Sequence, residues 1–286
     1  MRRPYRRRRV FPTILIILII LVGIILYDGS TRIVTTEYEL YYKHLPEAFD
    51  GFRIVVLSDI HAAVFGDNNE LLVEKVVAAK PDIIAITGDL IDGYKNLPSD
   101  IQLEVAKTLV TALVPVAPVY FITGNHDWDS GSIRPLLAML EERGVHILRN
   151  KYTLLESGGE TIVLAGVDDP NGPADMIKPY ELIKKIKDAQ GDDFIVLLKH
   201  RNEDLPLFNV LGVDLVICGH GHGGLIRLPL TDGLIGQQRD WFPEYTNGVY
   251  TICETNMLVS RGLGNHTGIP RVFNNPHIPV AILRTA

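Results

Sequence analysis

Residues 53–61 read RIVVLSDIH, an apolar run of β-forming residues that passes directly into an aspartate and a histidine. Four later stretches repeat this arrangement: IIAITGDLID at 83–92, VYFITGNHD at 119–127, FIVLLKH at 194–200 and DLVICGHGHGG at 214–224. Each apolar run has the length and composition of a strand. Because ligands bind outside the carboxyl ends of strands in open α/β sheets, the five stretches predict one sheet edge that gathers His, Asp and Asn side chains.

The segments between these runs show helical periodicity, so strands and helices alternate in the first half of the chain. This order predicts parallel β-α-β units, whereas the second half has more strands and more Gly- and Pro-rich loops and predicts a mixed sheet. Residues 31–286 are expected to form one domain, since no linker divides them. The expected strands are 31–40, 53–58, 82–87, 119–123, 161–165, 194–198, 215–218, 249–253 and 278–283, and the expected helices are 68–79, 100–113, 133–143 and 177–189.

The N-terminus has the composition of a membrane anchor. Residues 1–9 contain six arginines, and residues 10–27 are an uncharged run of 18 residues. As a helix at ~1.5 Å per residue this run would extend ~27 Å, about the thickness of a bilayer core. The positive-inside rule predicts a single-pass protein of the cell membrane, with residues 1–9 cytoplasmic and residues 31–286 outside the cytoplasm. A cleaved signal peptide and a twin-arginine export signal around residues 8–11 are the alternatives.

The overall composition narrows the classes of function. The chain has 286 residues with 28 basic and 34 acidic side chains, and six of the basic ones belong to residues 1–9. The rest of the chain is therefore strongly acidic, which disfavours nucleic-acid binding. Its two cysteines, Cys218 and Cys253, exclude a disulfide scaffold and a cysteine-based zinc finger, and both lie in apolar runs where burial is expected. The sequence contains no P-loop, dinucleotide-binding, serine-hydrolase or zincin motif.

The order of the polar blocks resembles that of the calcineurin-like metallophosphoesterases. Their pattern is D-x-H, G-D-x-x-D, G-N-H-D/E, a later H and G-H-x-H, and all five blocks occur here between Asp59 and His222. Within that family the chain is most similar to a membrane-anchored bacterial branch that includes enzymes cleaving UDP-diacylglucosamine. That branch carries G-H-T-H-G-G-Q and a Ser-Arg-Gly-Leu-Gly segment, where this chain has GHGHGGL at 219–225 and SRGLG at 260–264. The resemblance implies a mixed α/β fold, a four-layer α-β-β-α sandwich, preceded by one N-terminal transmembrane helix.

The resemblance also implies roles for the residues of the five blocks. Two divalent metal ions, manganese first and iron, zinc or cobalt as alternatives, would share a carboxylate and a hydroxide that attacks the phosphorus. The first ion would be bound by Asp59, His61 and His222. The second ion would be bound by Asn125, His200 and His220, with Asp89 as the bridge between both ions. His126 would protonate the leaving oxygen, and Asp127 would orient the His126 imidazole.

Other residues extend the expected site. Arg227, Arg261 and His266 are candidates for substrate binding, the two arginines because guanidinium is always charged and bidentate. Asp92 matches the last acid of G-D-x-x-D and either supports the site or caps a turn. Gly221 replaces the Thr that is usual in the branch, so a difference is expected in substrate fit. Surface or loop positions are expected for three other histidines, His44, His146 and His277.

Together these features predict a metal-dependent phosphoesterase that hydrolyses a phosphodiester or pyrophosphate bond and is attached to the membrane by residues 10–27. The tether confines the site to the bilayer surface, which favours a substrate in a membrane lipid or an envelope precursor. A phosphomonoesterase or nucleotidase is the first alternative. The second is a scaffold that has lost catalysis, although such proteins usually lose the catalytic histidine and this chain keeps His126.

Overall fold

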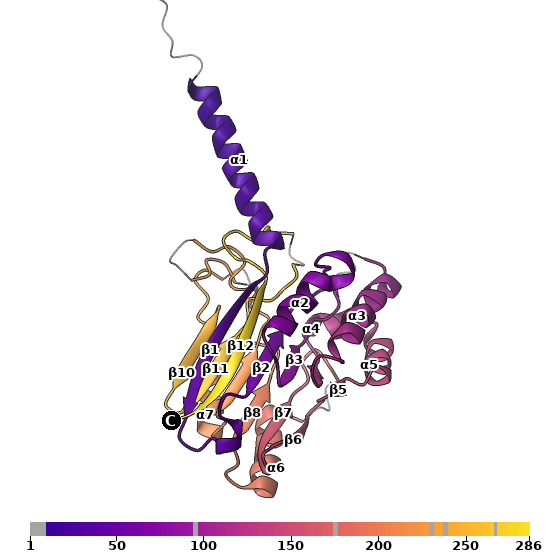
Figure 1. Cartoon of the computed structure of the whole chain (residues 1–286), viewed down its shortest axis with the longest axis vertical. Helices are drawn as coiled ribbons and strands as arrows, with labels where there is room; N and C mark the ends of the chain where they lie inside the picture. Colours follow the sequence, from indigo (N-terminus) through magenta and orange to yellow (C-terminus); the bar gives the residue numbers. More distant parts are fainter. Residues whose placement is uncertain (1–9, 94–96, 174–176, 229–231, 237–239, 266–267) are drawn as a thin grey trace, which may run out of the picture.

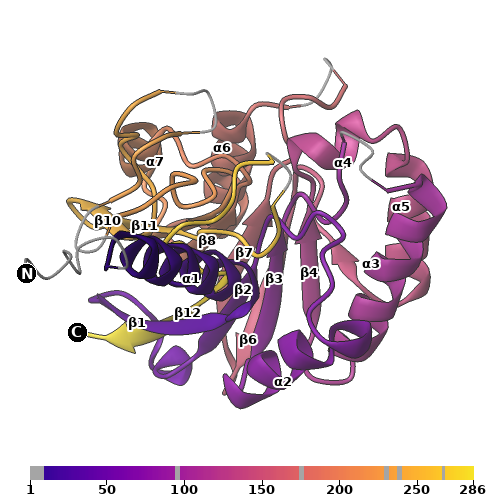
Figure 2. The same ribbon diagram turned by 90° about the horizontal axis from the view of Figure 1, so that it is seen from above.

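The computed structural model describes residues 10–93, 97–173, 177–228, 232–236, 240–265 and 268–286. The chain forms an N-terminal helix followed by two six-stranded sheets, with helices on the outer face of each sheet (Figures 1 and 2). The four-layer α-β-β-α sandwich expected from the sequence is confirmed.

The first sheet contains the N-terminal strands and the last strand of the chain. Its strand order is β1 (Val34–Tyr42), β12 (His277–Thr285), β2 (Arg53–Leu57), β3 (Ile83–Thr87), β4 (Val119–Ile122) and β5 (His146–Ile147). The strands from β2 to β5 are parallel, as the alternation of strands and helices predicts. β12 pairs antiparallel with β2 and parallel with β1, so the first and last strands of the domain lie side by side.

The second sheet is mixed, again as predicted. Its strand order is β10 (Gly248–Ile252), β11 (Thr255–Val259), β9 (Leu215–Cys218), β8 (Ile195–Leu198), β7 (Glu160–Gly166) and β6 (Lys151–Ser157). The four central strands are parallel, whereas β10 and β6 pair antiparallel with their neighbours.

Alternate side chains of the strands face different layers of the sandwich. In β2, Ile54 and Val56 lie in the core between the sheets, whereas Val55 and Leu57 pack against helices. Burial of apolar surface stabilises a fold by roughly 25 cal/mol per Å². The packing of these side chains on both faces therefore fixes the positions at which the strands end. The helices over the first sheet are α2 (Glu70–Ala78), α3 (Ser99–Leu113) and α5 (Ile133–Glu142). The helices over the second sheet are α6 (Pro179–Gln190) and α7 (Leu205–Leu211). Two short 3₁₀ turns are η2 (Glu47–Phe49) and η3 (Asp67–Asn69).

The N-terminal helix α1 (Val10–Thr31) extends beyond the predicted span of residues 10–27. Its stretch Pro12–Thr31 contains an 18-residue window with a mean hydropathy of 2.4 and is long and apolar enough to cross a membrane. Past the apolar run, Asp28 and Arg32 pair across one turn at the end of the helix, with 2.6 Å between Oδ1 and Nε. β1 therefore begins later than the strand start expected at residue 31.

Two expectations about single residues are wrong. Cys253 is exposed, because it lies in the two-residue turn between β10 and β11 with a φ of 51°, whereas Cys218 is buried as expected. His277 is completely buried at the start of β12, where the strand enters the core, rather than at the surface.

Candidate metal centre

The five polar blocks meet at one end of the sandwich, where strands of both sheets end. The seven residues predicted to bind metal follow these strands directly: Asp59 and His61 after β2, Asp89 after β3, Asn125 after β4, His200 after β8, and His220 and His222 after β9. The polar block after β4 continues into the short helix α4 (Asn125–Asp129). The structure thus brings all seven residues together from two different sheets.

Five of these residues have left-handed backbone conformations. The φ angles are 52° at Asp59, 50° at His61, 53° at Asp89, 64° at His220 and 46° at His222. This region costs free energy for residues other than glycine, and such residues cluster where function requires a particular side-chain direction. Bonds between neighbouring loops hold the conformation, for example from the His61 N–H to the Asp89 carbonyl at 2.9 Å.

Two glycines permit the close approach of the loops after β3 and β4. Gly88 has a φ of 90°, and a Cβ on it would lie 2.6 Å from the Gly124 nitrogen. A Cβ on Gly124 would collide with the carboxylate and the backbone nitrogen of Asp89. A larger residue at position 88 would therefore push the two loops apart, and one at position 124 would displace Asp89.

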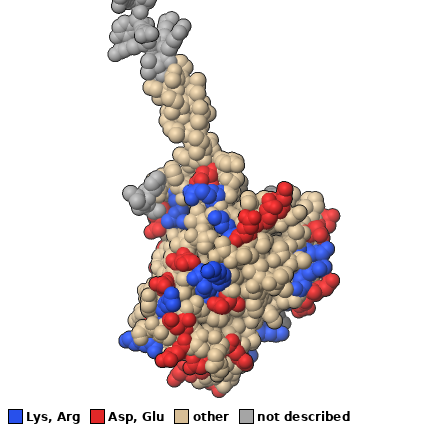
Figure 3. Space-filling view, viewed as in Figure 1, with Lys and Arg blue, Asp and Glu red and all other residues tan. Residues whose placement is uncertain are grey.

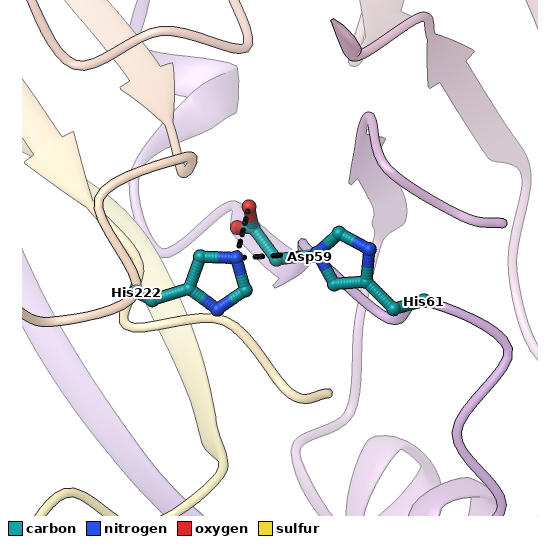
Figure 4. Close-up of side chains that lie close together, drawn as sticks. All are labelled: Asp59, His61 and His222. Carbon is teal, nitrogen blue, oxygen red and sulfur yellow. Dashed lines mark hydrogen bonds and ion pairs between the residues drawn. The ribbon is translucent and has the colours of Figure 1, made fainter. Parts of the chain in front are cut away.

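Asp59, His61 and His222 form the first cluster of ligand atoms (Figure 4). The Nε2 atoms of His61 and His222 lie 3.2 Å apart, and Nε2 of His222 lies 3.5 Å from Oδ1 of Asp59. All three residues are buried, and the two imidazole rings are stacked with their centroids 5.0 Å apart. Two imidazole nitrogens and a carboxylate oxygen that converge in this way can bind one cation.

Asp89, His200 and His220 form the second cluster, with Asn125 beside them. Nε2 of His200 lies 3.1 Å from Oδ2 of Asp89, 3.1 Å from Oδ1 of Asn125 and 3.3 Å from Nδ1 of His220. The other ring nitrogen of His200, Nδ1, donates to the carbonyl oxygen of Thr87 at 2.8 Å, which leaves Nε2 facing the cluster. A backbone acceptor for the second nitrogen is typical of metal-binding histidines.

The carboxylate of Asp89 lies between the two clusters. Its Oδ2 is 3.1 Å from Nε2 of His200 in the second cluster and 3.8 Å from Nε2 of His61 in the first. Each cluster also contains two imidazole nitrogens at hydrogen-bond distance from each other, an arrangement that a cation between them would satisfy. The imidazole, carboxylate and amide donors suit Mn²⁺, Fe, Zn²⁺ or Co²⁺. The residues thus fit two divalent ions.

Burial and neighbouring charges shift the pKa values of these groups in different directions. Burial lowers the pKa of His220 to about 3 and raises the pKa of Asp59 to about 6. Burial also disfavours the charged form of His200, but the Asp89 carboxylate outweighs it and raises the pKa of His200 to about 10. Burial acts against ionisation of Asp89 as well, yet the imidazolium of His200 holds the pKa of this carboxyl well below its ordinary value. The buried Asp89 carboxylate and the His200 imidazolium thus stabilise each other's charged form.

The carboxylate of Asp127, which the sequence assigns to the His126 ring, accepts hydrogen bonds from the backbone of two loops. Oδ2 accepts the N–H groups of Asp89 and Gly124, each at 2.8 Å. Oδ1 accepts the N–H groups of the two residues after Asp89, at 2.9 and 3.1 Å. Asp127 thus ties the loop after β3 to the loop after β4.

The carboxylate that faces the His126 ring belongs to Asp92. Its Oδ1 lies 3.4 Å from Nδ1 of His126, and the Gly93 N–H donates to the same nitrogen at 3.2 Å. The ring packs edge-on against His61, with centroids 4.8 Å apart and planes at 90°. The backbone N–H of His126 donates to Oδ1 of Asp89 at 2.8 Å, which places this residue directly beside the Asp89 carboxylate.

Two buried residues that the sequence analysis missed hold His222 in place. Asn274 Nδ2 donates to the His222 carbonyl at 2.7 Å, and Nη2 of Arg271 lies 3.4 Å from Nδ1 of the same histidine. They come from the loop before β12, about fifty residues further along the chain, and no spacing pattern marks them.

The predicted substrate-binding arginines lie beside Gly223, the residue after His222. Arg227 Nη1 donates to the Gly223 carbonyl at 3.0 Å, and a Cβ on Gly223 would lie 2.9 Å from Cγ of Arg261. Burial, together with the charge of Arg227, lowers the pKa of Arg261 to about 10. The third candidate, His266, lies outside the described residues.

Comparison with known proteins identifies relatives over nearly the whole chain. The family model described as Calcineurin-like phosphoesterase matches residues 52–224. The uncharacterized metallophosphoesterase YkuE of Bacillus subtilis is 32% identical over 266 residues, which cover 91% of this chain and 88% of that protein. A transmembrane protein with metallophosphoesterase domain from Danio rerio is 29% identical over 263 residues, which cover 87% of this chain and 57% of that protein.

Solved structures share the fold at low sequence identity. The sulfate thiohydrolase SoxB of Thermus thermophilus has a TM-score of 0.51 and 13% identity, covering 85% of this chain and 58% of that protein. The NAD nucleotidase NadN of Haemophilus influenzae has a TM-score of 0.50 and 14% identity, covering 74% of this chain and 45% of that protein. The chain thus spans only about half of each of these proteins, and the likeness concerns the fold alone.

Proposed function

Since this chain belongs to the calcineurin-like phosphoesterase family, we propose that it hydrolyses phosphoesters at the two ligand clusters where β2, β3, β4, β8 and β9 end. The observation that carries the proposal is the position of Asp89, whose Oδ2 lies between Nε2 of His61 and Nε2 of His200. Two neighbouring cations repel each other, so a shared carboxylate is what a dinuclear centre requires.

The proposed ligand sets follow the two clusters. The first ion would be held by Asp59, His61 and His222, and the second by Asn125, His200 and His220, with Asp89 common to both. When bound, two such ions polarise a phosphoryl oxygen and lower the pKa of water. The protein contributes the fixed directions of the ligands: Thr87 orients His200, and Asn274 holds the backbone of His222. Manganese is the metal that we propose first, with iron, zinc and cobalt as alternatives.

We assign proton transfer to the leaving oxygen to His126. Imidazole is the side chain best suited to exchanging protons near neutral pH. The Gly93 N–H donates to Nδ1, and the Asp92 carboxylate lies 3.4 Å from the same nitrogen, so both groups contact the Nδ1 side of the ring. In this proposal Asp92 takes the orienting role that the sequence analysis gave to Asp127.

The substrate that we propose is a phosphodiester or pyrophosphate in a membrane lipid or envelope precursor. Two observations support it. The helix α1 carries an apolar stretch long enough to span a bilayer. A cavity of about 250 Å³ adjoins the second cluster, and its lining includes Asn202, His220 and Tyr245. Its mixed polar and aromatic wall suits a polar group next to a phosphoryl group.

The proposed topology keeps the divisions expected from the sequence. Residues 1–9 are a cytoplasmic basic segment, residues 10–27 cross the membrane, and residues 31–286 are one catalytic domain outside the cytoplasm. The apolar surface of α1 and the six arginines before it support this orientation. The same features support membership of the membrane-anchored bacterial branch.

Rates on two chromogenic substrates test the proposal. We expect the purified full chain to hydrolyse bis-nitrophenyl phosphate faster than nitrophenyl phosphate, to lose activity in EDTA and to regain it with Mn²⁺. A faster rate on the monoester would favour a phosphomonoesterase. A metal-loaded chain that hydrolyses neither substrate would favour a scaffold without catalysis.

A further inference from the structure

Large apolar side chains are exposed in the loops around the base of α1. The exposed fractions are 47% for Leu228, 70% for Trp241, 71% for Phe242 and 43% for Phe273. All four belong to the loops that follow β9 and precede β12, and these loops gather at the end of the sandwich from which α1 leaves (Figure 1). We call these four residues the apolar rim.

The base of α1 is fastened to the loop that contains Phe273. Asn275 Nδ2 donates to the carbonyl and to Oδ2 of Asp28, at 2.7 and 3.0 Å. One residue further along α1, a Cβ on Gly29 would collide with the carbonyl of Arg271. Asp28 is the first charged residue after the apolar run, so it marks the level at which a spanning α1 would leave the hydrocarbon. Phe273, between these two contacts, lies at the same level.

Backbone pairing connects the loop that contains Phe273 to the loop that contains the other three residues of the rim. Val272 forms a bridge with Ile226, two residues before Leu228. Arg227 forms a bridge with Gly233, and the strand-like pairing continues from Ile235 to Trp241. The N–H of Phe242 donates to the Leu234 carbonyl at 3.0 Å. The four side chains thus belong to loop segments that are joined by backbone hydrogen bonds and lie beside α1.

The chemistry of the rim suits the interface of a lipid bilayer. Tryptophan and other aromatic side chains are enriched at headgroup level, where one part of the ring is apolar and another contacts water. Figure 3 shows α1 without charged side chains above its base, whereas acidic and basic side chains are mixed on the face of the domain below it. An uncharged helix favours insertion of this end of the molecule into a membrane.

The same loops build the candidate metal centre. Asn274 and Arg271, which flank Phe273 closely, contact His222. The segment with Trp241 also supplies Tyr245 to the lining of the 250 Å³ cavity beside His220. A membrane surface that contacts the rim would therefore lie next to the entrance of this cavity.

We infer that Leu228, Trp241, Phe242 and Phe273 form a membrane-contact surface that inserts into the headgroup region of the bilayer. The inference rests on the proposed anchoring by α1 and deepens it, because the rim gives the domain a second contact with the bilayer beside the base of α1. With the rim inserted, the cavity faces the lipid surface, and the substrate reaches the centre from the bilayer.

Fluorescence quenching by labelled lipids tests the inference in the full chain. The protein is reconstituted into phosphatidylcholine–phosphatidylglycerol vesicles that contain a nitroxide near the headgroup. The chain has two tryptophans, Trp128 and Trp241, so the quenching that Trp241→Phe removes belongs to Trp241. We expect roughly half of the Trp241 emission to be quenched, since this side chain lies at headgroup level.

A tryptophan placed at the far end of the domain is the matched control. Val210 lies at the end of α7 and is 82% exposed, and in Trp241→Phe a further Val210→Trp change is expected to show no quenching. Flotation of the vesicles and turnover of a soluble diester are measured in the same samples. A chain that does not float refutes the anchoring and the inference with it. A chain that floats and turns over the diester while Trp241 is unquenched overturns the inference alone.

Discussion

Replacement of Asp127 by asparagine tests whether this carboxylate holds the backbone of the centre. Its two oxygens accept four buried N–H groups, two at each oxygen. Asparagine keeps one oxygen and presents an amide donor to the other two N–H groups. Each buried N–H without an acceptor costs ~1–3 kcal/mol. Two buried N–H groups without an acceptor predict a decrease of roughly 2–6 kcal/mol in the free energy of unfolding. This decrease is a large part of the ~5–15 kcal/mol by which a typical protein is stable.

Urea unfolding of the full chain in detergent, followed by circular dichroism, measures this change. Burial, with the Asp89 charge, raises the pKa of Asp127 to about 7, so the comparison is made near pH 8.5, where the carboxyl is ionised. EDTA is added so that differences in metal binding do not contribute. The control is Asp129→Asn in the same helix, whose exposed carboxylate contacts Asn171 and whose loss is expected to change the free energy by about 0.5 kcal/mol or less.

The result that would refute this reasoning is an Asp127→Asn chain with the unfolding free energy of the unaltered protein. If that chain also bound metal normally and lost only turnover, Asp127 would act on the His126 ring, as the sequence first suggested.

Three further predictions concern the chemistry and the topology. His126→Ala is expected to keep both metals and the fold but to slow turnover by roughly 10²–10⁴, with a smaller loss for nitrophenolate leaving groups; metal analysis that showed depletion would make His126 a ligand. Asp92→Asn is expected to lower turnover by roughly tenfold and to alter the pH–rate profile, since it removes the charge beside Nδ1 of His126; an unaltered profile would remove Asp92 from the proposed mechanism. A reporter fused at the C-terminus is expected to be active only outside the cytoplasm, and protection of residues 31–286 from protease in intact spheroplasts would reverse the orientation.

The sequence predicts the strands near the centre well, because their signals are local. Each parallel strand is a short apolar run, and the polar residues that follow it are contiguous with it, as in β3 and Asp89. The strands that were missed lack such a signal. β6 is partly exposed and polar, and β11 follows β10 after a turn of two residues that separates two short runs. The sheet order, in which β12 lies between β1 and β2, depends on contacts between the two ends of the chain.

The partners of the centre residues are equally non-local. The assignment of Asp127 to the His126 ring relied on adjacency in the sequence, whereas its carboxylate accepts four backbone N–H groups. Asp92, from the loop after β3, reaches the ring instead. Arg271 and Asn274 contact His222 only because β12 returns to the first sheet, and no pattern within their own segment indicates this contact.

The most direct test of the account is the number of metal ions per chain in the unaltered protein and in Asp89→Asn. Mass-spectrometric metal analysis of the purified full chain, paired with the rate on a chromogenic diester, gives both quantities from one preparation. Asp89 contacts both clusters, so we predict two divalent ions in the unaltered chain, and loss of metal and rate together in the variant. An Asp89→Asn chain that kept two ions and the full rate would contradict the dinuclear centre.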